Sequence, residues 1–78
     1  MNVLAFGIAK DIFGASAVEV ELADAKTVAN LKASLEARYP RLKQLSSYMV
    51  AVNNEYAETA NILQQRDEVA IIPPVSGG

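Results

Sequence analysis

The residues of this chain that are best suited to chemistry lie at its C-terminal end. Residues 73–78 read PPVSGG, and they finish with the carboxylate of Gly78 beside Gly77. Because glycine has no Cβ, a Gly-Gly end can enter a channel that is too narrow for other residues. We therefore expect the reactive group to be the carboxylate of Gly78. The alternative is a terminus of small residues that has no chemical role.

The residues before the two glycines would form a thin, extended tail. Pro73 and Pro74 restrict φ to about −65° and lack a backbone N–H, so they end a strand and favour an extended path. A tail held in this way has less conformational entropy to lose on binding. Val75 continues the tail, and Ser76 either donates a hydrogen bond inside such a channel or fills space. We predict a folded domain over residues 1–72 and a reactive tail over residues 73–78.

The composition excludes several other kinds of chemistry. The chain has no cysteine and no histidine, which removes disulfides, thiolate metal sites, cysteine nucleophiles and histidine bases. Nine acidic residues outweigh seven basic ones for a net charge of −2, so we expect no nucleic-acid partner. No apolar run approaches the ~20 residues that span a bilayer, and no leader is evident. We therefore expect a cytoplasmic protein with no membrane partner.

The carboxylates elsewhere in the chain are weak candidates for a site. Asp67 and Glu68 are adjacent, so their side chains point apart and make a poor acid–base pair. Glu19 and Glu21 share the polar face of a predicted strand, and no other oxygen ligand lies near them in sequence. We expect no metal site, and no glycine-rich phosphate loop is present.

The order of predicted elements indicates an α+β domain. Residues 2–8 form an apolar run typical of a buried strand, and residues 9–13 suit a helical turn closed by Gly14. Residues 16–22 alternate apolar and acidic side chains, which predicts a strand paired with the first one. The second half is expected to hold a helical turn at 41–47 and strands at 48–53, 55–57 and 68–73. One helix would then cover one face of a mixed sheet.

The main helix has clear boundaries in the sequence. The hydroxyl of Thr27 can accept a hydrogen bond from an unpaired backbone N–H, which predicts an N-cap. Pro40 ends the helix, because the residue before a proline avoids the α region. An apolar stripe follows at helical spacing, made of Val28, Leu31, Leu35 and Tyr39. In the polar stretch 59–67 we expect Ile62 and Leu63 to anchor the chain to the core.

Four stretches together resemble a known family. They are VLAFGIAKDIFG at 3–14, TVANLKASL at 27–35, VAVN at 50–53 and DEVAIIPPVSGG at 67–78. The chain resembles proteins of the ubiquitin-like, or β-grasp, fold and, within that fold, the family of small sulfur-carrier subunits of molybdopterin synthase. The resemblance covers essentially the whole chain, and the last stretch is its most specific part.

This resemblance implies a function. In the family an activating enzyme consumes ATP to adenylate the C-terminal glycine, here Gly78, and the adenylate becomes a thiocarboxylate. The tail then enters the active site of the large synthase subunit and donates its sulfur to a pterin precursor, which builds the dithiolene of molybdopterin. The resemblance implies a non-catalytic subunit that binds no cofactor itself and assembles into a heterotetramer with the large subunit.

The resemblance also implies an apolar surface that docks the large subunit. The residues at these positions are Phe6, Tyr56 and Ile72, with Lys10 as an added charge. Ile72 lies opposite in phase to Val69 and Ile71, so both faces of the last strand carry apolar residues. A sheet with a helix on one side only would leave one of those faces uncovered. The alternatives are ordinary core positions and a solvated lysine.

Other functions share the same tail. The chain could be a ubiquitin-like modifier joined through Gly78 to lysines of other proteins. It could also carry sulfur for thiamin synthesis or tRNA thiolation, or be an interaction module with an inert tail.

Overall fold

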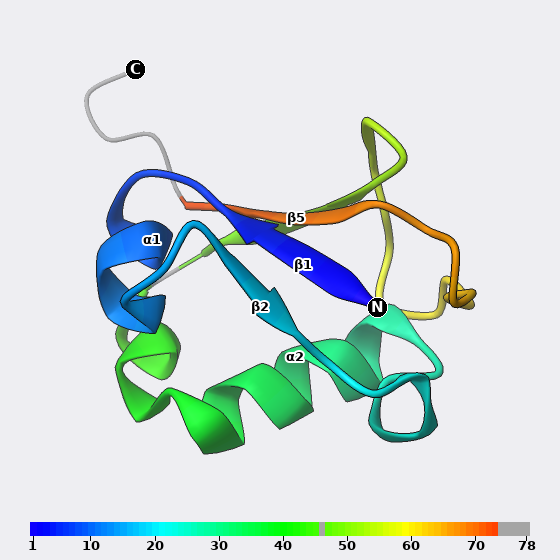
Figure 1. Ribbon diagram of the computed structural model, residues 1–78, viewed down its shortest axis with the longest axis horizontal. Coiled ribbons are helices and arrows are strands. Elements are labelled where there is room, and N and C mark those ends of the chain that lie inside the picture. Colours follow the sequence, from blue (N-terminus) through cyan, green and yellow to red (C-terminus); the bar gives the residue numbers. More distant parts are fainter. Residues whose placement is uncertain (46, 74–78) are drawn as a thin grey trace.

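The protein folds as one mixed sheet covered on one face by a helix (Figure 1). The structure is a computed structural model and describes residues 1–45 and 47–73. In chain order the elements are β1 (Asn2–Ala5), α1 (Ile8–Phe13), β2 (Ala17–Glu19), the 3₁₀ turn η1 (Leu22–Asp24), α2 (Val28–Arg38), the 3₁₀ turn η2 (Pro40–Gln44), β3 (Met49–Val52), β4 (Glu55–Tyr56) and β5 (Val69–Ile72).

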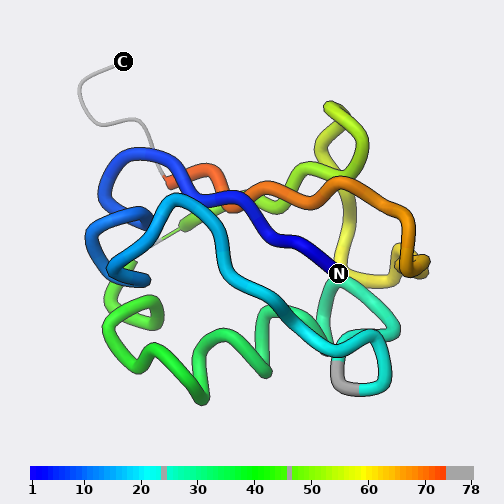
Figure 2. Tube along the Cα trace, in the orientation of Figure 1, coloured from blue at the N-terminus to red at the C-terminus, as the bar shows by residue number. Residues whose placement is uncertain are grey.

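The strands of the described residues follow the order β2-β1-β5-β3-β4. β1 and β5 run parallel at the centre, and the other neighbours are antiparallel. The first two strands therefore pair as predicted, with Val3 opposite Val18. The predicted α+β, β-grasp arrangement is confirmed. In Figure 2 the two central strands lie next to each other although one begins the chain and the other precedes the tail.

The core lies between the sheet and α2. The helix buries Val28, Leu31 and Leu35 along the stripe that the sequence predicts. These side chains share one cluster with the helix-facing residues of the three inner strands, β1, β5 and β3, which are Val3, Ala5, Val50, Val69 and Ile71. None of the polar or charged residues that the structure describes is buried. The stability of the domain therefore depends on this single apolar layer.

The helix begins and ends where the sequence predicts. The Thr27 hydroxyl accepts a hydrogen bond from the backbone N–H of Asn30 at 3.1 Å. At the other end Tyr39 leaves the helix directly before Pro40, which begins η2. All five predicted strands are shorter than expected, and the first two differ most. β1 ends at Ala5 because Gly7, with φ 55°, turns the chain into α1, and the predicted strand 16–22 pairs only over Ala17–Glu19.

The prediction for Ile62 was wrong, whereas the one for Leu63 is confirmed. Leu63 is buried, but Ile62 is 73% exposed and forms an isolated bridge with Thr27. Neighbouring side chains of an extended segment point in opposite directions, so only one of the two can reach the core.

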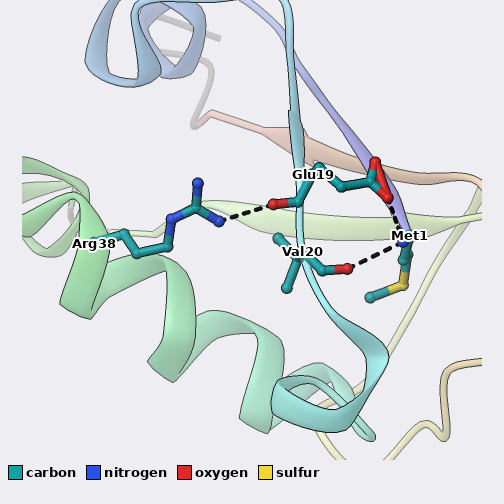
Figure 3. Close-up of polar contacts among 4 residues, drawn as sticks. All are labelled: Met1, Glu19, Val20 and Arg38. Atoms are coloured by element: carbon teal, nitrogen blue, oxygen red, sulfur yellow. Dashed lines mark hydrogen bonds and ion pairs between the residues drawn. The ribbon is translucent and has the colours of Figure 1, made fainter.

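Edge strand β2 is tied to both the helix and the first strand (Figure 3). Arg38 donates a hydrogen bond from Nη1 to the carbonyl of Glu19 at 2.9 Å. The amino group of Met1 donates to Oε1 of Glu19 at 2.8 Å and to the carbonyl of Val20 at 3.0 Å. The carboxylate of Glu19 is exposed, so these contacts fix geometry more than they add stability.

Tyr48 joins the start of β3 to the helix. Its hydroxyl donates a hydrogen bond to Glu36, and Nζ of Lys32 lies 4.9 Å from the centre of its ring. Burial, together with the hydrogen bond and the charge of Glu36, raises the pKa of Tyr48 well above its ordinary value. The phenol is a neutral donor at physiological pH, and its raised pKa keeps the link between β3 and α2 intact at alkaline pH as well.

We expect Leu31→Ala to lower the free energy of unfolding by about 3 kcal/mol, because it opens a cavity at a fully buried position. Chemical denaturation measures this change. Ile62→Ala is the matched control, since its exposed side chain should cost less than about 0.5 kcal/mol. Equal losses in the two variants would contradict this placement of the core.

Candidate functional site

Hydrogen bonds of the Asn53 and Asp67 side chains hold the start of β5, the strand that leads into the tail. The carboxylate of Asp67 accepts hydrogen bonds from the backbone N–H of Gln64 at 2.8 Å and from Nδ2 of Asn53 at 3.1 Å. The backbone N–H of Glu68 donates to Oδ1 of Asn53 at 3.0 Å. Asn53 and Asn54 both have positive φ, as the predicted turn requires. Asp67 therefore shapes the turn before β5.

The tail starts from the centre of the sheet. β5 lies between β1 and β3, so it is held on both sides up to Ile72. Pro73 follows directly and is half-buried, which agrees with its predicted role of ending the strand. The other predicted tail residues lie outside the described residues; they are Pro74, Val75, Ser76, Gly77 and Gly78. The division into a domain 1–72 and a tail 73–78 stays a prediction.

The face of the sheet that α2 leaves uncovered has a hollow of about 350 Å³. It brings together three of the predicted interface residues, Phe6, Tyr56 and Ile72, from three different strands or their ends. Phe6 is 49% exposed and Tyr56 69% exposed, so they are not core residues. The expected phase of the last strand is also confirmed, since Val69 and Ile71 are buried beneath the opposite face.

Part of the lining of this hollow was not predicted from the sequence. The remaining lining residues are Leu4, Ala51, Asn54, Glu68 and Ala70. Strand alternation places Leu4 on the same face as Phe6, and Ala70 on the same face as Ile72. These two lining residues could therefore have been predicted from the sequence. The two alanines pair across β3 and β5 and make a low floor between larger side chains. Of the two polar lining residues, Glu68 directly precedes β5 and Asn54 lies in the turn between β3 and β4, so neither is next to the tail.

Lys10 lies apart from this hollow. It is exposed on α1 and is not part of the lining. Its role at an interface therefore stays a prediction.

The described part of the chain offers little other chemistry. Over residues 1–45 and 47–73, no group of three or more carboxylate, histidine or cysteine side chains could hold a metal ion. In the same residues no helix is long and apolar enough to cross a membrane. The features that remain are the apolar hollow and the tail that begins at its edge.

Comparison with protein families and curated relatives gives consistent results. The model of the ThiS family matches residues 3–78. The molybdopterin synthase sulfur carrier subunit of Mycobacterium tuberculosis is 38% identical over 100% of this chain and 96% of its own length. The subunit of the same name from Arabidopsis thaliana is 35% identical over 100% of this chain and 82% of its own length.

Solved structures share the fold. SAMP1, the small archaeal modifier protein 1 of Haloferax volcanii, superposes with a TM-score of 0.82 at 26% identity, over 99% of this chain and 97% of its own. A chain in the complex of subunits 1 and 2 of the molybdopterin-converting factor of Helicobacter pylori superposes with a TM-score of 0.69 at 24% identity. That match covers 99% of this chain and 96% of the other.

We expect Tyr56→Thr to leave the free energy of unfolding within about 0.5 kcal/mol of the parent value, because the ring is largely exposed and threonine suits a strand. Thermal or chemical denaturation checks this expectation. Ile62→Thr is a control of similar exposure that lies outside the hollow. A loss of about 2 kcal/mol or more in Tyr56→Thr alone would identify Tyr56 as a core residue.

Proposed function

Because the chain belongs to the ThiS family, we propose that it is the sulfur-carrier subunit of a molybdopterin synthase. One observation carries the proposal: the similarity to the curated sulfur carrier subunits extends over the whole chain at 35–38% identity in the two relatives compared. The family match also reaches residue 78 and so includes the Gly-Gly end.

The chemistry of the carrier follows from its C-terminal carboxylate. A carboxylate is a poor electrophile, because attack on it must add charge to a group that is already anionic. In the proposed reaction an activating enzyme transfers AMP from ATP to the carboxylate of Gly78, with release of pyrophosphate. A sulfur nucleophile then displaces AMP and leaves a thiocarboxylate. With no cysteine in the chain, that sulfur has no competing thiol.

The chain acts in this proposal as a donor and not as the catalyst. The active site lies in a large partner subunit, into which the tail inserts to deliver sulfur to a pterin precursor. ATP binds the activating enzyme, and this chain holds no cofactor. The apolar hollow lined by Phe6, Tyr56 and Ile72 is the surface on which the large subunit docks. The cytoplasm is the compartment that we propose.

The similarity to SAMP1 supports a second candidate function, that of a protein modifier. Both functions begin with adenylation at Gly78, so activation alone does not separate them. They differ in the acceptor: sulfur transfer leaves a free chain, whereas modification leaves an isopeptide bond to a lysine. Adducts that survive reducing, denaturing electrophoresis would favour the modifier.

We expect protein incubated with the activating enzyme, ATP and a sulfur source to gain the mass difference between sulfur and oxygen, located at Gly78. Intact-mass and C-terminal fragment spectra measure this gain. A chain that lacks Gly78 should still bind the large subunit but should transfer no sulfur. If the full chain keeps its original mass under these conditions, the proposed function is wrong.

We expect Tyr56→Thr to weaken binding to the large subunit by about tenfold or more, since exposed aromatic residues at the centre of an interface contribute strongly. Calorimetric titration of the full chain measures the dissociation constant. Ile62→Thr should bind like the parent, because Ile62 lies outside the hollow. Equal affinities for all three proteins would place the docking surface elsewhere.

A further inference from the structure

The loop after β1 touches the first residue of the tail. Gly7 has φ 55° and ψ −131°, a backbone conformation that L-residues rarely adopt. A Cβ added at Gly7 would lie 3.2 Å from Cγ of Pro73. The backbone of the loop therefore lies close to the proline ring, and a side chain at Gly7 would be tight against that ring.

The parallel pairing of the central strands explains this contact. Ala5 and Ile71 are the last partners between β1 and β5, and both strands end at the same edge of the sheet (Figure 1). Gly7 lies two residues beyond Ala5, and Pro73 lies two residues beyond Ile71. At this edge the chain turns at Gly7 into α1, while Pro73 leads out of β5.

The ring of a proline is more rigid than other side chains, which suits it to a fixed contact. Its side chain closes on its own backbone nitrogen, so the ring can change pucker but cannot rotate away. A group that pushes on Cγ is therefore accommodated only by a change of ring pucker or by a shift of the Pro73 backbone. Gly14 provides a comparison, because it also has positive φ, at 73°, but an added Cβ there meets nothing within 4 Å.

We propose that Gly7 is a positioning residue for sulfur transfer: its bare backbone supports the ring of Pro73 and sets the direction in which the tail leaves the sheet. This inference rests on the proposed function, and it adds a role for a residue outside the tail. Gly7 touches no substrate and acts through Pro73.

The same contact connects the tail to the docking surface. Phe6 precedes Gly7 and Ile72 precedes Pro73, and both Phe6 and Ile72 line the hollow. Phe6 and Ile72, which would contact the large subunit, are thus the sequence neighbours of Gly7 and Pro73, which lie against each other. A partner seated on the hollow would hold both sides of the contact and so fix the start of the tail.

A structural test does not depend on the function. In the full chain, nuclear Overhauser effects should connect the Hα protons of Gly7 with the ring protons of Pro73. Their absence, with the sequential effects of both residues present, would overturn the proposal whatever the protein does.

The kinetic test compares Gly7→Ala with Gly14→Ala. Both variants place a side chain at positive φ, with more backbone strain at Gly7, because its ψ of −131° lies outside the αL region that Gly14 adopts. Only Gly7→Ala also presses on Pro73. In single-turnover transfer from the thiocarboxylate to the pterin precursor, at saturating large subunit, we expect Gly7→Ala to be slower by about tenfold, because small misplacements of a reacting group are costly. Gly14→Ala should transfer at the parent rate, and the dissociation constants should not change.

A double variant separates positioning from simple destabilisation. Pro73→Ala removes Cγ, so adding Gly7→Ala to Pro73→Ala should slow transfer no further. Equal rates for Gly7→Ala and the parent, or additive losses in the double variant, would overturn the positioning role. Neither result would alter the proposed function, which fails only if the parent thiocarboxylate delivers no sulfur.

Discussion

The parallel pairing of β1 with β5 is the constraint on which the rest of the structure depends. It joins residues that are more than 60 positions apart, Val3 with Val69 and Ala5 with Ile71, and it places the last strand inside the sheet. A tail that leaves an edge strand is restrained on one side only. Here β5 is hydrogen-bonded to a neighbour on each side, so the tail begins at a point held by two strands.

The same pairing explains why one face of the sheet is apolar without a cover. Parallel strands are normally buried on both faces, and their sequences are correspondingly apolar throughout. In this domain α2 covers one face, and over the described residues the other face carries the exposed hollow. The residues left uncovered, Phe6, Tyr56 and Ile72 among them, form a hollow and not a flat surface, because alanines occupy its floor. Such a shape suits a partner surface with a projecting apolar group.

Local patterns in the sequence predicted the elements, and non-local pairing decided the details. The N-cap at Thr27 and the end of the helix at Pro40 depend on neighbouring residues, so they could be predicted. The burial of Leu63 and the exposure of Ile62 depend on which side of an extended segment meets the core, and a polar stretch does not reveal that. The contact between Gly7 and Pro73 follows from a strand pairing across the chain. The tail residues 74–78 were identified from their chemistry together with the resemblance to a known family, and they lie outside the described residues.

In the proposed carrier the hollow recognises the partner, and the C-terminal carboxylate takes part in the reaction. The dipeptides Phe6-Gly7 and Ile72-Pro73 connect these two parts of the molecule. In each, the first residue lines the hollow and the second makes the contact at the base of the tail. A tail without a fixed base could leave the sheet in many directions. It would lose this conformational freedom on entering the partner's channel, and the lost entropy would weaken binding. A fixed base removes part of that cost before docking. It also explains why a carrier with no catalytic side chain still needs a rigid fold: the fold sets where a reactive carboxylate begins its path, and the partner supplies the chemistry.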